Sequence, residues 1–268
     1  MSSSPRTLLE TILRRERAVV VVALVLITIM AWVYTLAGAG MKLNAFEMTA
    51  MVRSMGMEVM AWSPVYAALI FMMWWIMMIA MMLPSAAPML LMFAKINRAR
   101  RKDGTMFVPT AVFLAGYLAI WAFFSLIATL MQWLLGQYGL MSPAMSTSSM
   151  WLGAAILLAA GCYQFSTIKY VCLRHCRHPI QFITVHWRDG TAGAFRMGLV
   201  HGAFCLGCCW FLMGLLFFGG VMNVYWIAGL AIYVLAEKLL PLGHWLGYAA
   251  GAALCLAGGA LVVANLVS

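Results

Sequence analysis

The sequence predicts an all-α membrane protein, a polytopic transmembrane helical bundle of about seven spans that forms a single membrane domain over residues 1–268. Hydrophobic residues make up 65% of the chain and charged residues only 9%, whereas soluble domains carry roughly 25% charged residues. Apolar runs of about 20 residues, the length that crosses a bilayer as a helix, alternate with short charged segments. The net charge of +10 therefore describes membrane topology, and the lipid bilayer, not nucleic acid, is the expected partner.

Seven apolar runs define the expected spans, and the segments between them differ in character. Residues 1–17 are polar and basic and are expected to form a cytoplasmic tail. Residues 38–63 form a methionine-rich connecting segment that is expected on the external side. Residues 169–191 carry cysteine, histidine and basic side chains and are predicted to be a cytoplasmic loop. The spans themselves are expected at 18–37, 64–93, 109–135, 149–168, 192–218, 224–240 and 244–266.

Local signals set several of these boundaries. The first span follows a basic segment that ends at Arg17, and no convincing small-residue cleavage site precedes its end, so we expect it to remain as an anchor. The second span contains Pro84 and Pro88, which are expected to break or kink its helix near the cytoplasmic end. The sixth span is expected to stop at Pro241, since proline cannot continue a helix.

The distribution of lysine and arginine predicts the orientation of the bundle. With seven spans, all 17 Lys and Arg residues except Lys42 and Arg53 fall on one side of the membrane. Basic residues are enriched in cytoplasmic segments of membrane proteins. The N-terminus is therefore expected in the cytoplasm and the C-terminus outside.

The strongest chemical pattern is a set of cysteine and histidine residues in the fifth span. His201, Cys205 and Cys208 fall on one face of a helix, and Cys209 lies at the edge of that face. A single buried cysteine is usually a small apolar residue, and a single buried histidine is usually hydrogen-bonded to a neighbouring helix. Four such residues within nine positions favour a soft metal site instead.

Methionine rows in the second span suggest further soft ligands. Met77 and Met81 follow one helical row, and Met78 and Met82 follow the next. Thioethers bind Cu(I) without bringing a charge into lipid, although methionine stripes more often serve packing. Both sets of residues are expected near the middle of the bilayer, so a joint site between the two spans is geometrically possible.

Two further groups lie near the expected cytoplasmic side. Cys172 and Cys176 are one helical turn apart and suggest a port where a metal enters or leaves, although a basic segment anchored at lipid headgroups is an equal alternative. Glu237 is the only acidic residue well within a span. It is expected to pair with Lys238 or with a basic residue of a neighbouring segment, or else to carry protons or bind a hard cation. Lys238 is close enough to the membrane surface to extend its ammonium group toward water.

These patterns together resemble one known family. The runs YQFSTIKYVCLRHCRHP, HWRDGTAGAFRMGLVHGAFCLGCCWFLM and FFGGVMNVYWIAGLAIYVLAEKLLP, with WWIMMIAMMLPSAAPM before them, resemble the DUF2182 family of predicted metal-binding integral membrane proteins. The resemblance covers roughly residues 65–245. It implies a multi-pass protein of the bacterial inner (cytoplasmic) membrane that handles a metal, and it implies no catalytic residues.

The leading functional hypothesis is a carrier, importer or membrane chaperone for a soft metal, and Cu(I) is expected before zinc or iron. The chain has no GxxxxGK[ST] nucleotide-binding loop, so its own ATPase activity is not expected. The alternative is an accessory or assembly subunit of a larger membrane copper or haem enzyme. A metallochaperone or such a complex is then the expected protein partner. A thiol oxidoreductase is disfavoured because a helix does not allow the neighbouring Cys208 and Cys209 to form a disulfide, and no enzymatic activity is expected.

Overall fold

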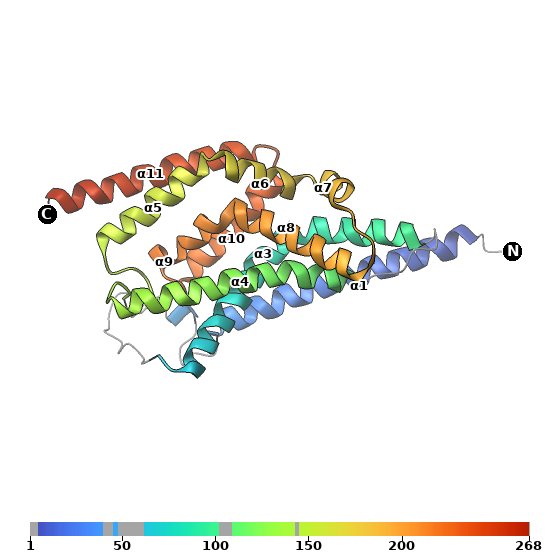
Figure 1. Cartoon of the computed structure of the whole chain (residues 1–268), viewed down its shortest axis with the longest axis horizontal. Coiled ribbons are helices and arrows are strands. Elements are labelled where there is room, and N and C mark those ends of the chain that lie inside the picture. Colours follow the sequence, from blue (N-terminus) through green and yellow to red (C-terminus); the bar gives the residue numbers. More distant parts are fainter. Residues whose placement is uncertain (1–4, 40–44, 48–61, 102–108, 143–144, 268) are drawn as a thin grey trace.

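The computed structural model describes residues 5–39, 45–47, 62–101, 109–142 and 145–267, and the part of the chain that it describes is all-α with no β-strand (Figure 1). This confirms the predicted fold class. Most of the methionine-rich segment expected at 38–63 lies outside the described residues. The helices are α1 (Pro5–Leu36), α3 (Pro64–Arg101), α4 (Thr110–Gln137), α5 (Met150–Gln164), α6 (Thr167–Arg177), α7 (Pro179–His186), α8 (Gly190–Gly214), α9 (Leu216–Gly219), α10 (Val224–Leu239) and α11 (Gly243–Val267).

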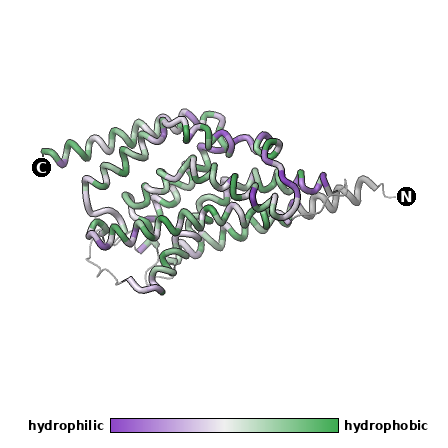
Figure 2. Tube along the Cα trace, viewed as in Figure 1, coloured by the Kyte–Doolittle hydropathy of each residue, from purple (hydrophilic) through white to green (hydrophobic). Residues whose placement is uncertain are grey.

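Five of the described helices are long and apolar enough to cross a membrane, and a sixth span is possible if α5 and α6 count together as one bent segment. The expected number of about seven is larger because it includes α10. That helix has only 16 residues, which is shorter than the roughly 20 residues that a membrane-spanning helix needs. Figure 2 shows apolar residues along these helices, with hydrophilic residues gathered over α6 and over the connection between α7 and α8.

The helices pack into a central group that is flanked by α1 on one side and by the pair α5 and α11 on the other (Figure 1). α4 and α8 pack against each other along their lengths, and α3 packs against α4 and α10. α1 lies beside α3, and α5 lies beside α11 on the other side of the molecule. The buried core includes the inward faces of α3, α4, α8 and α10.

Glycines allow the close approach of α4 and α8. A Cβ atom on Gly198 of α8 would collide with the backbone carbonyl of Phe113 on α4, and a Cβ atom on Gly116 would collide with the carbonyl of Phe195. Small residues at such contacts let two apolar helices approach backbone to backbone. This contact fixes the position of the α8 face that carries the cysteines.

The segment 169–191, expected to be a loop, is mostly helical instead. α6 begins at Thr167, where the Ser166 side chain accepts a hydrogen bond from the Lys169 backbone amide at 3.1 Å. α7 begins at Pro179, and proline is well tolerated in the first turn of a helix. The axis turns by 63° between α5 and α6. The basic composition of the segment suggested a loop, but a capping serine and a first-turn proline define two short helices.

The second expected span forms one long helix. α3 continues without interruption from Pro64 to Arg101, so Pro84 and Pro88 do not break the helix. A kink at these prolines, the other expectation, stays a prediction. What they flank is a buried polar residue, Ser85, whose hydroxyl donates a hydrogen bond to the Met82 carbonyl at 2.9 Å.

Candidate metal centre

The predicted face of α8 points into the protein. His201, Cys205, Cys208 and Cys209 are all buried. The Cys208 and Cys209 thiols each donate a hydrogen bond to the Cys205 carbonyl, at 3.0 Å. Helical spacing alone therefore identified the buried face correctly, because the four residues recur at intervals of three and four.

A fourth thiol reaches this face from a different helix. Cys176 on α6 interacts with the thiols of Cys205 and Cys208 across the α6–α8 contact. We refer to Cys176, Cys205, Cys208 and Cys209 as the thiol cluster. Sequence analysis had placed Cys176 at a cytoplasmic port, whereas the structure packs it against the cysteines of α8.

Cys172 lies at the edge of the thiol cluster, one turn from Cys176. Its sulfur packs against Gly207, where an added Cβ atom would come within 2.7 Å of Cys172 Sγ. Both cysteines of α6 interact with Cys208, and Cys176 interacts with Cys205 as well. Periodicity could not reveal this, because the difference depends on which part of α8 lies opposite each residue.

Lys238 on α10 is the charged group closest to the thiol cluster. Its ammonium nitrogen is 3.0 Å from Cys205 Sγ and 3.0 Å from Ser85 Oγ, and the residue is only 5% exposed. The prediction that Lys238 reaches toward water is therefore wrong. Its side chain turns inward instead, because the Ser85 hydroxyl and the Cys205 sulfur offer partners within the protein.

Two side chains that sequence analysis missed complete the surroundings of Cys205. The Tyr117 hydroxyl on α4 donates to the Met82 carbonyl at 3.2 Å and lies 3.2 Å from Cys205 Sγ. Ser85 on α3 supports Lys238. Both are polar residues within apolar runs, and this was the signal that could have identified them. Side chains from α3, α4 and α10 thus meet around a single sulfur atom of α8.

His201 lies one turn before Cys205 and is enclosed by aromatic rings. Its ring centroid is 5.4 Å from that of Phe182 and 5.7 Å from that of Tyr117. Its Nδ1 atom is buried and has no hydrogen-bond partner among the described residues. Buried polar atoms of this kind are uncommon in proteins and often mark functional sites, so His201 retains an unused capacity to bind a proton or a metal.

Glu237 belongs to a separate buried network. It forms an ion pair with Lys169 of α6, and the two side chains are only 1% and 3% exposed. Lys169 also donates to the Gln164 side chain, and the Tyr233 hydroxyl donates to Glu237 at 3.3 Å. Of the two pairings considered from sequence, the one with a neighbouring segment is therefore present. Adjacent residues of α10 have different roles, since Glu237 binds α6 and Lys238 faces the thiols.

A comparison with protein families shows which family the chain belongs to. Residues 71–261 match PpoB2, a family described as a copper chaperone. The chain belongs to the PpoB2 family. No curated protein matches the chain, and no solved structure does. The match includes every residue of the thiol cluster, together with Lys238, Ser85 and Tyr117. It is a metal-handling family of the kind implied by the sequence resemblance, while the DUF2182 name itself stays a prediction.

The methionine rows of this PpoB2 protein are part of its core. Met77, Met78, Met81 and Met82 are all buried. However, α3 packs against α1, α4 and α10, and α3 and α8 do not form an extended contact along the described residues. Tyr117 and Lys238 bridge the two helices instead. Direct ligation by a methionine of α3 together with a cysteine of α8 therefore stays a prediction.

The thiol cluster is not a preformed metal cage. Over the residues that the structure describes, no three His, Cys, Asp or Glu side chains are arranged to hold a metal ion. The Cys208 and Cys209 thiols instead hydrogen-bond within their own helix. A metal bound here would have to replace these two thiol hydrogen bonds, and their loss would weaken binding. Weaker binding is compatible with a protein that later releases the metal.

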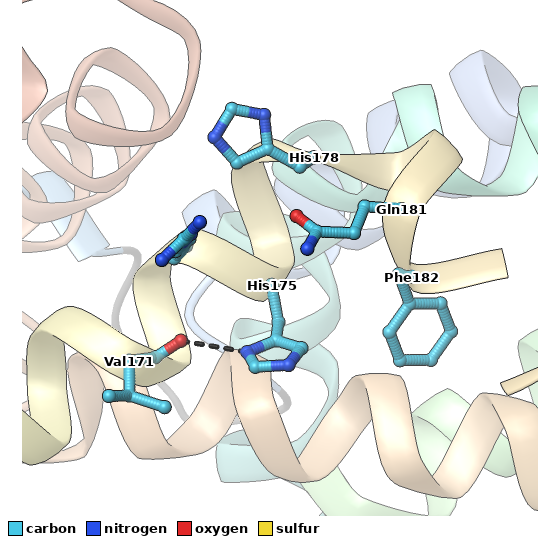
Figure 3. Close-up of a pocket in the computed structure, with 6 residues that line it drawn as sticks. Val171, His175, His178, Gln181 and Phe182 are labelled. Carbon is cyan, nitrogen blue, oxygen red and sulfur yellow. Dashed lines mark hydrogen bonds between the residues drawn. The ribbon is translucent and has the colours of Figure 1, made fainter. Parts of the chain in front are cut away.

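The surface near the predicted port carries histidines instead of cysteines. A pocket of about 200 Å³ lies over α6 and α7 and is lined by Val171, Arg174, His175, His178, Gln181 and Phe182 (Figure 3). His175 Nδ1 lies 2.8 Å from the Val171 carbonyl, and its ring stacks on Phe204 with centroids 4.1 Å apart. Neither Cys172 nor Cys176 lines this pocket, and their role as a port for a metal stays a prediction.

Proposed function

We propose that this PpoB2-family protein is a membrane copper chaperone that holds Cu(I) at the thiol cluster. The observation that supports the proposal most strongly is the meeting of Cys176 from α6 with Cys205 and Cys208 from α8. Two helices that are distant in sequence place soft donors at one buried point, in a chain whose family is described as a copper chaperone. Thiolates favour Cu(I) over hard cations.

The donor set fits the low coordination number of Cu(I). Two or three sulfur atoms are sufficient for this ion, and Cys176, Cys205 and Cys208 provide them. Cys209 and His201 are the nearest additional donors on α8, and Met77, Met78, Met81 and Met82 are candidate soft ligands along α3. Cys172 is less suited, because its sulfur packs against Gly207.

The position of the cluster suits temporary storage of copper. Cys205, Cys208 and Cys209 are buried on α8, and Cys176 is partly buried on α6, so bound Cu(I) is largely shielded from water and from oxidants. α6 is joined to α5 through a 63° bend at residues 165 and 166. We propose that movement of α6, which removes Cys176 from the other thiols, releases the ion. Such an element with two arrangements is what a transfer protein needs.

The expected orientation indicates the side of the membrane on which the protein exchanges the ion with a partner. We propose an N-terminus in the cytoplasm of a bacterial inner membrane, as the distribution of lysine and arginine indicates. The ion then passes to or from a soluble metallochaperone or a membrane enzyme complex. Without a nucleotide-binding loop, the transfer depends on a partner or on a concentration gradient.

The proposal is tested by metal analysis of the protein purified in detergent from copper-replete cells. We expect wild type to retain about one copper per chain, and Cys205→Ser/Cys208→Ser to lose it, because two of the three proposed thiol ligands are removed. The matched control is Cys162→Ser/Cys255→Ser. These two cysteines interact with each other, away from the thiol cluster, and their removal should leave copper unchanged.

Two results would count against this function. Wild type without copper, or a Cys205→Ser/Cys208→Ser variant that retains as much copper as the control, contradicts copper binding at the cluster. Copper that appears only when a stoichiometric membrane partner copurifies supports the accessory-subunit alternative instead.

A further inference from the structure

Lys238 places a buried positive charge beside the proposed copper ligands. Burying an ammonium group within a membrane protein is costly unless it is paired. Glu237, its neighbour in sequence, is already paired with Lys169, and no carboxylate forms an ion pair with Lys238 among the described residues. The Lys238 charge is instead directed at Cys205 Sγ, 3.0 Å away, and is held there by Ser85 Oγ at 3.0 Å.

A role in helix assembly alone does not explain this arrangement. Lys238 connects α10 to α3 through Ser85, but a neutral polar side chain could make the same hydrogen bond at a lower desolvation cost. What a neutral side chain cannot provide is a fixed charge next to the sulfur that binds metal. The charge itself therefore calls for a function.

We propose that Lys238 determines the metal specificity of the thiol cluster by favouring monovalent over divalent ions. This inference rests on the proposed function, because it concerns the same site. A metal bound to Cys205 Sγ lies about 2.3 Å from the sulfur, and hence no farther than about 5 Å from Lys238 Nζ. At this distance the ammonium group repels a divalent ion twice as strongly as a monovalent one.

The size of the effect follows from Coulomb's law. With the effective dielectric constant of about 20 that suits protein sites, one additional unit of charge about 5 Å from Lys238 lowers affinity on the order of 100-fold. Cu(I) carries one unit of charge and Zn(II) two. Lys238 thus discriminates against Zn(II), which thiolates would otherwise also bind well.

The test compares two affinities in the full-length protein in detergent under anaerobic conditions. Cu(I) is titrated against a competing Cu(I) chelator and Zn(II) against a competing Zn(II) chelator, for wild type and for Lys238→Leu, Lys238→Arg and Lys95→Leu. Lys238→Leu removes the charge without adding a metal-binding atom. Lys238→Arg retains the charge, and Lys95→Leu removes one positive charge from an exposed position near the end of α3.

The readout is the ratio of Zn(II) affinity to Cu(I) affinity. We expect Lys238→Leu to raise this ratio on the order of 100-fold, while Lys238→Arg and Lys95→Leu stay within a few-fold of wild type. The ratio of each variant is compared with that of wild type, and the metal ligands are the same in all of these proteins. Differences in preferred geometry between Cu(I) and Zn(II) therefore cancel in the comparison. A packing role alone would weaken both affinities together and leave the ratio unchanged.

The possible outcomes separate this inference from the proposed function. If wild type binds Cu(I) and the ratio is unchanged in Lys238→Leu, or rises equally in Lys238→Arg, the specificity role is wrong while the copper site stands. If wild type binds no Cu(I), the proposed function fails and the specificity role with it. Should Lys238→Leu not fold, Lys238→Gln provides a second neutral variant with the same expected rise and the same contradicting result.

Discussion

Two buried lysines have different roles, although the partner of one is adjacent in the sequence to the other. Lys169 of α6 pairs with Glu237 of α10, and Lys238 turns toward Cys205 and Ser85. The Lys169–Glu237 pair holds α6 against α10. It thereby places Cys176 of α6 opposite the cysteines of α8.

Removal of one member of this ion pair is expected to destabilise the protein strongly. Lys169→Met leaves Glu237 buried without its charge partner, and breaking a buried pair in this way costs about 3–5 kcal/mol. We expect a matching decrease in the free energy of unfolding, measured in detergent by denaturant titration.

The double variant is the control for this prediction. Lys169→Met/Glu237→Gln removes both charges, so much of the lost stability should return. If Lys169→Met is as stable as wild type, the ion pair does not hold α6 in place.

At the residue scale, the sequence identified part of the site. The spacing of His201, Cys205, Cys208 and Cys209 was sufficient to predict a shared buried face, because helical periodicity fixes which residues lie together. It could not predict that Lys238 faces Cys205 or that Tyr117 reaches the same sulfur. These contacts depend on how separate helices pack against each other. The spacing of residues within one helix contains no information about that packing.

At the scale of the helices, the contact between α4 and α8 determines where the thiol cluster lies. Gly116 and Gly198 allow the two backbones to approach, since a Cβ atom on either residue would collide with a carbonyl of the other helix. The same approach brings Tyr117 of α4 to Cys205 of α8.

Gly198→Ala is expected to force these two helices apart. The added methyl group meets the Phe113 carbonyl of the backbone, which cannot move independently, and overpacking of this kind costs about 1–3 kcal/mol. Thermal unfolding in detergent measures the loss. The matched control is Gly214→Ala on the same helix, where an added Cβ meets nothing within 4 Å and stability should be nearly unchanged. Equal stability of the two variants would contradict the close-contact role of Gly198.

The helices were predicted correctly where the length of an apolar run determines them. The prediction was wrong where capping residues start a short helix in a polar segment. The long apolar runs predicted α1, α3, α4, α8 and α11 as helices that can span a membrane, and the structure has all five. The segment 169–191 was predicted as a loop because it is basic and polar. Ser166 and Pro179 start two short helices there, and one of them supplies Cys176.

At the scale of the whole molecule, five helices contribute to the surroundings of one sulfur atom. α3 provides Ser85, α4 provides Tyr117, α6 provides Cys176, α10 provides Lys238, and α8 carries Cys205 itself. All five lie largely or wholly within the region that matches the PpoB2 family. The thiol cluster is therefore a product of the assembled bundle, whereas the sequence had suggested a stripe of ligands on a single helix.

The central claim is that copper binds where α6 and α8 meet, and two cysteines of α6 test it most directly. Cys176 interacts with the thiols of α8, whereas Cys172 packs against Gly207. The measurement is the Cu(I) affinity of Cys176→Ser and Cys172→Ser, determined against the same competing chelator. We expect Cys176→Ser to lose at least about tenfold in affinity, since even residues that only support a ligand contribute this much, and Cys172→Ser to remain within a few-fold of wild type. An equal or larger loss in Cys172→Ser would contradict the proposed site.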